Sequence, residues 1–418
     1  MKKVAIIGFG CAGYSAARAI KASAPEITPD IYSATDDAPY NPMLTTYFVS
    51  GKIGKEEMFP LGDLEKVRSD LGANIFTRCK VAQLRARDKT IVLSDGSEKK
   101  YDSIIITSGA GAVIPPVGPL PDKGIYTMRT AQDAYALSAG LDNVDSALVV
   151  GAQMVGIKLV ELLHKRGIKV TLADMAGHMF PASAYPSVAE IISDRLEDAG
   201  IELKFSAAVS GISEENGRLV ARFSDGGVLS TDIVVFCSGI RPNIDFVDRS
   251  ELDVGTGIKT DLGMRTNVPG VYAAGDCCET LNLLTGKNAY IGLWANSYMQ
   301  GKVAGENAVG GDSFYKGNLI HNITHYMDTD FISIGDVNAD GERVVWEHSD
   351  GLWRIEATVA EGRIAALNIL DNTGIAGPMK NALVQQACSP QCKMSTASKL
   401  ILQQSGMPAS IIRKLGGA

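Results

Sequence analysis

The sequence has 418 residues, which favours two to four domains at about 150 residues per domain. Its 45% hydrophobic and 21% charged residues are typical of a globular protein and exclude the disordered, collagen-like and disulfide-scaffold classes. The 47 acidic residues outnumber the 40 basic ones, and the formal charge is −7. We therefore expect neither a nucleic acid nor an anionic membrane as partner.

The N-terminus and the cysteines indicate the compartment. Residues 4–7 form an apolar run that is too short for the core of a signal peptide. No stretch approaches the roughly 20 apolar residues needed to cross a bilayer. The seven cysteines are an odd number at irregular spacings, which argues against a secreted disulfide framework. The sequence thus predicts a cytoplasmic protein.

A glycine-rich turn follows the first predicted strand. Residues 4–7 have the apolar character of a buried parallel strand, and the turn at residues 8–13 reads G-x-G-x-x-G before a helical stretch. In such a turn Gly8 bends the chain, Gly10 lets a pyrophosphate approach the backbone, and Gly13 lets the helix pack on the strand. This predicts a dinucleotide site at the helix N-terminus, with a plain tight turn as the alternative.

The second strand of such a unit normally ends in an acidic residue that binds the adenosine ribose. Here the segment 30–33 ends in Ser33, and Asp36 and Asp37 follow slightly later. A hydroxyl group can also form a hydrogen bond with a ribose, although a weaker one than a carboxylate forms. Ser33 is therefore a candidate cofactor-binding residue.

The same pattern recurs in the middle of the chain. A predicted strand at residues 147–150 is followed by a turn at residues 151–156, a helix and a second strand that ends in Asp174. Asp174 lies 18 positions after Gly156, close to the spacing of the residue that binds ribose. Its carboxylate would repel a 2′-phosphate, which favours NADH over NADPH.

The second turn lacks one of the three glycines. Gln153 occupies the position at which the backbone should approach the pyrophosphate, and Met154 and Val155 complete the turn after it. The segment is therefore either a nicotinamide site or a structural βαβ unit that has lost its ligand. If both units bind, the chain holds two dinucleotides, a flavin and a nicotinamide.

Two further buried strands are predicted downstream. Residues 231–236 lead into Gly239, and residues 270–274 lead into Gly275 and the carboxylate of Asp276. The motifs resemble those of pyridine-nucleotide-disulfide-oxidoreductase-type flavoproteins. They are most similar to the branch with ferredoxin, rubredoxin and nitrite reductase flavin components, NADH oxidases and coenzyme A-disulfide reductases. The resemblance extends from residue 2 to about residue 386, and its motifs lie at residues 8–13, 107–110, 126–130, 239–243 and 272–276.

The resemblance implies an α/β fold with two Rossmann-like (βαβ) nucleotide-binding domains, the second inserted in the first, and an α+β C-terminal interface domain. Predicted short strands from residue 332 onward resemble that last domain, through which these enzymes usually form homodimers. The implied parts are an FAD-binding domain split between 1–112 and 230–312, an NAD(P)-binding domain at 113–229, the interface domain at 313–387 and a C-terminal tail at 388–418.

The resemblance also assigns two cofactors, FAD and NAD(P)H, with NADH favoured. In the family, the residue that matches Asp276 contacts the ribityl chain of the flavin. The residues expected to bind FAD are Gly8, Gly10, Cys11, Ala12, Gly13, Ser33, Asn41, Ser108, Gly109, Gly275 and Asp276. Those expected to bind NAD are Gly151, Gln153, Met154, Val155, Asp174 and Gly239.

Three positions depart from the family pattern. Met43 stands where the disulfide reductases and NADH oxidases have a redox-active cysteine, and a thioether cannot form a thiolate or a mixed disulfide. Thr46 replaces the lysine that oxygenase-type ferredoxin reductases have near the flavin. Lys158 replaces a glutamate beside the nicotinamide, where its charge could favour an anionic substrate or a reduced, anionic flavin. Met43 and Lys158 are candidate catalytic residues, and we expect Met43 simply to pack against the flavin ring system.

The remaining cysteines have less specific interpretations. Cys277 and Cys278 directly follow the flavin motif, and buried thiols are expected there because adjacent cysteines form strained disulfides. Cys388 and Cys392 form a C-x3-C pair, whereas a metal site normally needs four ligands, so no metal is predicted. The pair is either two free thiols in a loop or a redox or partner-contact dithiol.

Together these features predict an FAD-dependent oxidoreductase in which NADH reduces the flavin. Because the disulfide-forming cysteine is absent, the resemblance implies an iron–sulfur or rubredoxin-like electron carrier, or a partner subunit, as the acceptor. One alternative is a direct NADH-dependent reductase of a small organic substrate, and another is an NADH oxidase. The non-enzymatic alternative is an FAD-holding electron-relay subunit with a vestigial nicotinamide site.

Overall fold

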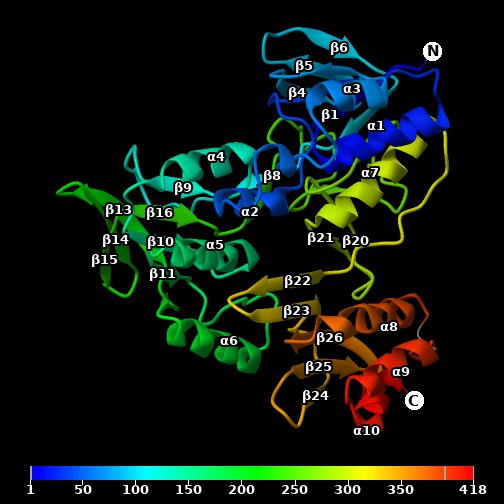
Figure 1. The fold of residues 1–418 in the computed structure, drawn as a ribbon. Coiled ribbons are helices and arrows are strands. Elements are labelled where there is room, and N and C mark those ends of the chain that lie inside the picture. Colours follow the sequence, from blue (N-terminus) through cyan, green and yellow to red (C-terminus); the bar gives the residue numbers. More distant parts are fainter. Residues whose placement is uncertain (1, 390–391, 418) are drawn as a thin grey trace. The chain divides into compact units, whose positions relative to one another are not determined.

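The structure is a computed structural model, and it describes residues 2–389 and 392–417 (Figure 1). Contacts between residues divide the chain into two compact units. The first contains the described residues of Met1–Gly111, Arg129–Ala131 and Ile240–Asn318, and the second those of Ala112–Met128, Gln132–Gly239 and Leu319–Ala418.

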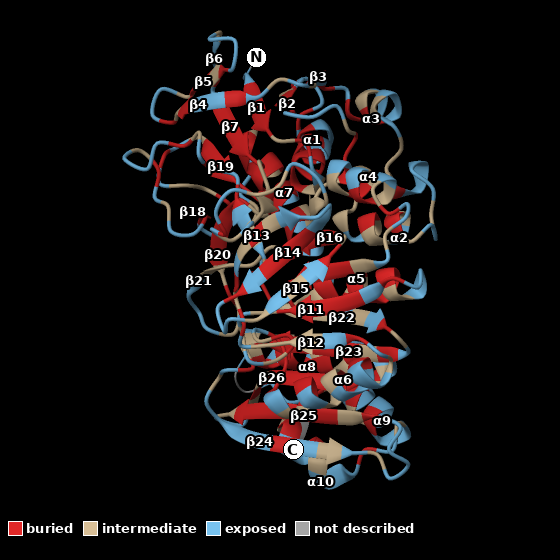
Figure 2. Ribbon diagram, turned by 90° about the vertical axis from the view of Figure 1, so that its left-hand side faces the viewer, coloured by how far each residue is buried: buried red, intermediate tan, exposed pale blue. Residues whose placement is uncertain are grey.

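A five-stranded parallel sheet with the order β19-β7-β1-β2-β3 forms the centre of the first unit. Its strands are β1 (Val4–Ile7), β2 (Asp30–Tyr32), β3 (Asn74–Phe76), β7 (Ser103–Ile106) and β19 (Val271–Ala273). Every residue of β1 and β7 is buried (Figure 2). This burial explains their nearly continuous apolar sequences.

The first unit also contains helices and two smaller three-stranded sheets, β4-β5-β6 and β18-β20-β21. Its helices are α1 (Cys11–Ser23), η1 (Pro42–Leu44), α2 (Thr45–Val49), η2 (Glu56–Met58), α3 (Leu64–Leu71) and α7 (Trp294–Ala308). Its other strands are β4 (Val81–Arg85), β5 (Thr90–Leu93), β6 (Glu98–Lys100), β18 (Ile258–Lys259), β20 (Cys278–Leu281) and β21 (Asn288–Tyr290). Strands β8 (Ala110–Ala112) and β17 (Ile240–Pro242) lie at its sequence borders.

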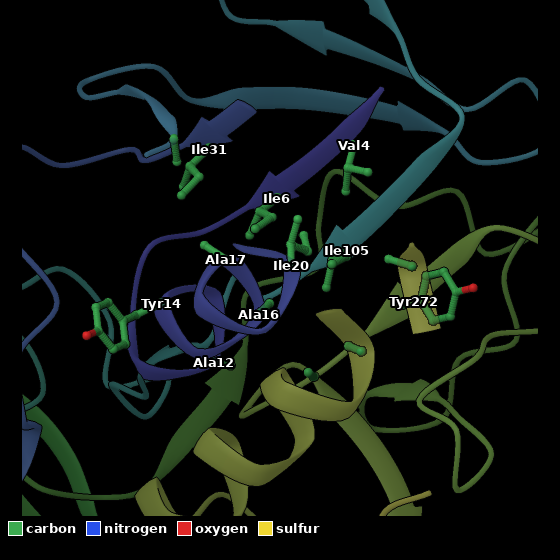
Figure 3. Packing of buried hydrophobic residues seen from close by; sticks show 14 of the residues in the cluster. Val4, Ile6, Ala12, Tyr14, Ala16, Ala17, Ile20, Ile31, Ile105 and Tyr272 are labelled. Atoms are coloured by element: carbon green, nitrogen blue, oxygen red, sulfur yellow. The ribbon is translucent and has the colours of Figure 1, made fainter. Parts of the chain in front are cut away.

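Helices α1 and α7 cross at very short range beside the parallel sheet. Gly301 and Gly305 of α7 face the carbonyl oxygens of Ala12 and Ala16, and a Cβ atom on either glycine would overlap those oxygens. Ala12, Ala16 and Ala17 of α1 belong to the same core as Val4 and Ile6 of β1 (Figure 3). This packing fixes the direction in which the N-terminus of α1 points.

A second five-stranded parallel sheet, with the order β12-β11-β10-β16-β9, lies in the second unit. Its strands are β9 (Ile125–Thr127), β10 (Ser146–Val150), β11 (Lys169–Ala173), β12 (Glu202–Lys204) and β16 (Ile233–Phe236). The accompanying elements are α4 (Ala131–Ala139), α5 (Met154–Lys165), α6 (Pro186–Asp198) and an antiparallel sheet of β13 (Val209–Glu215), β14 (Arg218–Phe223) and β15 (Val228–Thr231).

The C-terminal part of the second unit is an antiparallel sheet with the order β22-β23-β26-β25-β24. Its strands are β22 (His321–Tyr326), β23 (Thr329–Gly335), β24 (Glu342–Glu347), β25 (Arg354–Ala360) and β26 (Arg363–Leu370). The helical segments that follow are η3 (Thr373–Ile375), α8 (Ala376–Cys388), α9 (Thr396–Gln404), α10 (Ala409–Ile412) and η4 (Arg413–Gly417).

The architecture confirms the predicted α/β class. All five strands of the second parallel sheet lie in sequence between β7 and β19 of the first, so one Rossmann-like unit is inserted in the other. The antiparallel C-terminal sheet with its helices matches the expected α+β domain. The domain boundaries stay predictions, and the segment expected as a tail carries α9 and α10. Within residues 2–389 and 392–417, no helix combines the length and apolar character required to cross a membrane.

Candidate functional site

The first glycine turn is shaped by contacts that only glycine permits. Gly8 has a φ of +106°, and a Cβ atom on it would overlap the carbonyl oxygen of Thr107. A Cβ atom on Gly13 would overlap the carbonyl oxygen of Gly8. The hydroxyl of Thr107 donates hydrogen bonds to the carbonyl oxygens of Ile7 (3.1 Å) and Gly8 (2.9 Å). The turn is thereby fixed to the ends of β1 and β7, as the G-x-G-x-x-G spacing predicts.

The N-terminus of α1 is open and electropositive. Gly10 caps the helix without a side-chain hydrogen bond, the first turn carries no acidic residue, and a Cβ atom on Gly10 would meet nothing within 4 Å. The first amides of a helix need acceptors, and its N-terminus attracts anions. This cradle therefore fits the diphosphate of a dinucleotide.

Cys11 and Ala12 begin the helix at this cradle. Burial, reinforced by the charge of Asp276, raises the pKa of the Cys11 thiol to about 12. The thiol donates a hydrogen bond to the carbonyl oxygen of Trp294 (3.7 Å). Cys11 is therefore protonated at neutral pH and adds no negative charge at the N-terminus of α1.

Ser33 lies buried directly after β2, at the same edge of the sheet as the glycine turn. Its amide donates to the carbonyl oxygen of Phe76 (2.9 Å), and its hydroxyl accepts a hydrogen bond from the amide of Thr35 (3.4 Å). The carboxylate of Asp36 forms an ion pair with Arg78, whose hydrogen bonds lower the pKa of Asp36. Asp36 is thus engaged elsewhere, and Ser33 stays the candidate for the ribose.

Asn41 and Met43 lie on the short helix η1. The side chain of Asn41 caps this helix by accepting a hydrogen bond from the amide of Met43 (3.0 Å). The thioether of Met43 is highly accessible, with 64% of the residue exposed. An exposed apolar side chain at this family position is available for packing against a bound group, and that role stays a prediction.

Asp276 is held by two partners at the end of β19. Its Oδ2 atom lies 2.7 Å from Nη2 of Arg129, and its Oδ1 atom accepts a hydrogen bond from the hydroxyl of Ser297 (3.0 Å). Its side chain is 13% exposed. The Nε atom of Arg129 also donates to the carbonyl oxygen of Ala110 (3.1 Å). The motif at residues 126–130 was recognised in the sequence, but no role was predicted for Arg129. A charged residue shortly after a predicted strand could have indicated a residue of the site.

The third segment at this edge contains Ser108 and Gly109. Both carbonyl oxygens accept hydrogen bonds from Asn243, at 3.2 Å from its side-chain amide and 2.9 Å from its backbone amide. Gly109 has a φ of +68°, and no atom lies within 4 Å of the position of a Cβ. The neighbouring Cys277 is a buried free thiol, as expected, and burial raises its pKa to about 11.

These segments meet at one edge of the first sheet. Gly8 abuts Thr107 and Ser108, and the Cβ position of Gly275 lies 3.0 Å from the Cβ atom of Ala12. The first glycine turn, the residues after β7 and the Gly275–Asp276 pair are therefore contiguous. Ligands of open α/β sheets bind at the carboxyl ends of the strands, and the open Gly10 cradle lies there. The residues present thus fit FAD.

The second glycine turn retains two of its three structural glycines. Gly151 has a φ of +114°, and a Cβ atom on it would overlap the carbonyl oxygen of Cys237. A Cβ atom on Gly156 would overlap the carbonyl oxygen of Gly151. Gln153 caps α5 without a side-chain hydrogen bond, no acidic residue follows in the first turn, and Val155 is exposed. The helix N-terminus is therefore open to an anion here too, despite the side chain of Gln153.

Asp174 braces this second turn. Its Oδ2 atom accepts a hydrogen bond from the amide of Ala152 (2.7 Å), and its Oδ1 atom accepts one from the amide of Ala176 (2.9 Å). Each carboxylate oxygen has a second lone pair that can accept a ribose hydroxyl. Gly239, which follows β16, has a φ of +108° and open space at its Cβ position. These features suit a pyridine nucleotide at this turn.

Lys158 is engaged by residues of its own unit. Its ammonium group forms an ion pair with Glu161 (3.2 Å) and donates a hydrogen bond to the carbonyl oxygen of His325 on β22. Burial alone would raise the pKa of Glu161, but Lys165 and Lys158 outweigh it and hold the pKa below its usual value. The catalytic role considered for Lys158 stays a prediction, and its contacts describe an anchor between α5 and β22.

All seven cysteines are free thiols, and Cys388 and Cys392 are exposed. In the described part of the chain, no three His, Cys, Asp or Glu side chains are grouped to hold a metal ion.

Comparison with known proteins places this architecture in a family. A family model described as "Pyridine nucleotide-disulphide oxidoreductase" matches residues 2–301. An NADH oxidase of Methanocaldococcus jannaschii is 28% identical over 312 residues, which are 73% of this chain and 69% of the relative. The epsilon subunit of the NADH-dependent phenylglyoxylate dehydrogenase of Aromatoleum evansii is 27% identical over 343 residues, which are 80% of this chain and 79% of the relative.

Among solved structures, a water-forming NADH oxidase from Lactobacillus brevis has the same fold. The TM-score is 0.89 at 21% identity, and the match covers 99% of this chain and 100% of that one. The predicted family and cofactors are thereby confirmed. The chain belongs to the pyridine nucleotide-disulphide oxidoreductase family, and it is an oxidoreductase that binds FAD and NAD(P)H.

Proposed function

We propose that the protein passes electrons from NADH, through FAD, to an electron-carrier protein or a partner subunit. The flavin supplies the chemistry, because it accepts a hydride from a nicotinamide and can release electrons singly or in pairs. The residues of the chain supply binding, orientation and electrostatics.

One feature supports the choice of acceptor: the family resemblance aligns Met43 with the redox-active cysteine of the disulfide reductases and NADH oxidases. A thioether cannot alternate between thiolate and disulfide, so electrons have no internal disulfide to reduce at this place. The exposed side chain is instead suited to cover the flavin ring with a polarizable apolar surface. An acceptor outside the chain is then required.

The identity of the donor rests on Asp174. Its carboxylate lies at the end of β11, where the adenosine ribose of a bound pyridine nucleotide is expected. The negative charge favours two ribose hydroxyls and disfavours a 2′-phosphate. NADH is therefore the proposed donor.

The proposed FAD contacts follow from the geometry of the first unit. The open N-terminus of α1 would hold the diphosphate, and the buried side chain of Ser33 would face the adenosine ribose. Arg129 and Ser297 hold the carboxylate of Asp276 so that it can accept hydrogen bonds from the ribityl hydroxyls. Gly109 and Gly275 would leave room for the flavin beside these groups.

The relatives support two kinds of acceptor. The relative from Aromatoleum evansii is by name a subunit of a dehydrogenase, which supports transfer to a partner subunit. The relative from Methanocaldococcus jannaschii is by name an NADH oxidase, which makes molecular oxygen the second candidate. A cytoplasmic location, consistent with the free thiols, and a homodimer formed through the C-terminal sheet complete the proposal.

An anaerobic titration tests the donor half of this proposal. NADH should bleach the flavin absorption near about 450 nm stoichiometrically, whereas NADPH should need a much higher concentration. Failure of both nucleotides to bleach the flavin at millimolar concentration would sink the proposal and leave an electron-relay subunit that receives its electrons elsewhere. Equal titration by both nucleotides would refute the role of Asp174.

A further inference from the structure

Ala152, the residue beside the missing glycine, forms hydrogen bonds through both its backbone amide and its carbonyl group. Its amide donates to Asp174 (2.7 Å), and its carbonyl oxygen accepts a hydrogen bond from the amide of Phe180 (2.9 Å). The residue is fully buried. The path of the chain into Gln153 is thus held by two residues of the loop that follows β11, Asp174 and Phe180.

Phe180 makes this bond from an unfavourable backbone conformation. Its φ is +49°, in the left-handed region that bulky residues rarely adopt. Such a conformation persists only where the surroundings enforce it. The side chain of Phe180 is completely buried, and its carbonyl oxygen accepts hydrogen bonds from the amides of Ser183 and Ala184, both at 2.8 Å.

The surroundings that enforce it belong to the C-terminal sheet. The ring of Phe180 stacks on Phe331 of β23, with centroids 4.9 Å apart, and lies tilted against Tyr326 of β22 at 6.1 Å. The same hairpin receives the ammonium group of Lys158 at the carbonyl oxygen of His325. The hairpin β22–β23 is therefore linked to the turn indirectly by two routes, one through Phe180 in the loop after β11 and one through Lys158 on α5.

We propose that Phe180 and Lys158 are positioning residues for the pyridine nucleotide, and that the hairpin β22–β23 is the platform that holds the incomplete turn in its binding conformation. A turn with glycine at residue 153 would relax around a pyrophosphate, whereas a turn with Gln153 has a narrower choice of backbone conformations. The hydrogen bonds to Ala152 and the contact of Lys158 with His325 hold the turn in place and compensate for the lost backbone freedom at residue 153. The inference rests on the nicotinamide assignment proposed above.

Two matched variants separate the effect of the contact between Lys158 and the hairpin from the effect of a positive charge on α5. Lys158→Met removes the bond to the hairpin and keeps the apolar stem, while Glu161 keeps Lys165 as its partner. Lys165→Met removes an equal charge from the same helix. It leaves the contacts of Lys158 with Glu161 and with the carbonyl oxygen of His325 in place. Binding of ADP-ribose, a probe that fills the turn without redox chemistry, is measured by calorimetry on the FAD-loaded protein.

We expect the dissociation constant for ADP-ribose to rise about tenfold in Lys158→Met, by analogy with the effect of removing a residue that supports a metal ligand. It should stay within about twofold in Lys165→Met, and Lys158→Arg should recover most of the affinity because it restores a donor. In Lys158→Met the KM for NADH should rise by a larger factor than kcat at saturation falls, whereas Lys165→Met should change neither. The amide hydrogen of Ala152 should also exchange faster in that variant.

A second variant tests the other arm of the brace. Phe180→Gly tolerates the left-handed backbone and keeps the amide donor, but it removes the ring that ties the loop to the hairpin. It should weaken ADP-ribose binding by at least as much as Lys158→Met, and Phe180→Leu should fall between it and the wild type.

The outcomes distinguish this inference from the function on which it rests. Equal weakening in Lys158→Met and Lys165→Met would show a charge effect and overturn the inference, as would unchanged binding in both Lys158→Met and Phe180→Gly. Failure of the wild-type protein to bind ADP-ribose would instead refute the nicotinamide assignment itself.

Discussion

The Nη2 atom of Arg129 lies 2.7 Å from the Oδ2 atom of Asp276, although the two residues are 147 positions apart in the sequence. Both side chains are largely buried in the first unit. Removal of one partner of such a pair leaves a buried charge without compensation. The pair therefore contributes to the stability of the first unit and also holds Asp276 in the proposed flavin site.

Arg129→Met should lower both stability and flavin content. The loss of the cation from a largely buried pair should reduce the free energy of unfolding by roughly 3 kcal/mol, and Asp276 should no longer be held toward the ribityl chain. Thermal unfolding and the flavin-to-protein absorbance ratio measure the two effects. Arg241→Met is the matched control, because its exposed pair with Asp245 should contribute less than about 1 kcal/mol. Equal effects of the two substitutions would contradict the assignment.

Gly10→Ala should separate folding from flavin binding. The added methyl group meets nothing within 4 Å and the φ of Gly10 is negative, so the apoprotein should unfold within about 1 kcal/mol of the wild type. The same methyl group should obstruct the diphosphate and lower the flavin content. The comparison is Gly13→Ala, whose methyl group would overlap the carbonyl oxygen of Gly8 and should destabilise the apoprotein strongly. Full flavin occupancy in Gly10→Ala would refute the proposed cradle.

The local and the distant parts of these sites differ in how well the sequence predicted them. Gly8 and Gly13 were found because a tight turn and a close helix–strand contact impose glycine at fixed spacing. Arg129 lies 147 positions from Asp276 and His325 lies 167 positions from Lys158, and no local pattern encodes these two contacts. Lys158 was considered beside the nicotinamide through its family position, and only the folded chain brings it to His325. The bracing of Ala152 by Phe180 likewise depends on how the second unit packs.

Met43→Leu should leave flavin reduction by NADH intact. Leucine conserves volume and apolar character, so a side chain that only covers the flavin should be replaceable, with a rate change below about threefold. Anaerobic stopped-flow absorbance measures this rate. A loss of tenfold or more, with normal flavin content, would show that the thioether takes part in the reaction and would contradict the packing role.

Cys277 should contribute to a loss of stability at alkaline pH. Burial raises its pKa from an ordinary value of 9.0 to about 11, so the folded state holds its proton more tightly than the unfolded state does. Its contribution to stability is therefore complete below pH 9.0 and is lost as the pH rises toward about 11. Thermal unfolding between these values should show a shallower decline for Cys277→Ala than for the wild type. Parallel declines would argue against a buried neutral thiol.

The most direct test of the central claim is the fate of the electrons after anaerobic reduction by NADH. In a double-mixing stopped-flow experiment, the reduced protein is mixed either with air-saturated buffer or with an oxidised one-electron iron–sulfur carrier, with rubredoxin and a [2Fe–2S] ferredoxin used in turn. The account predicts slow reoxidation by oxygen and fast reoxidation by at least one carrier, accompanied by bleaching of that carrier. Fast reoxidation by oxygen, with no carrier reduced faster than oxygen is, would contradict it and identify an NADH oxidase.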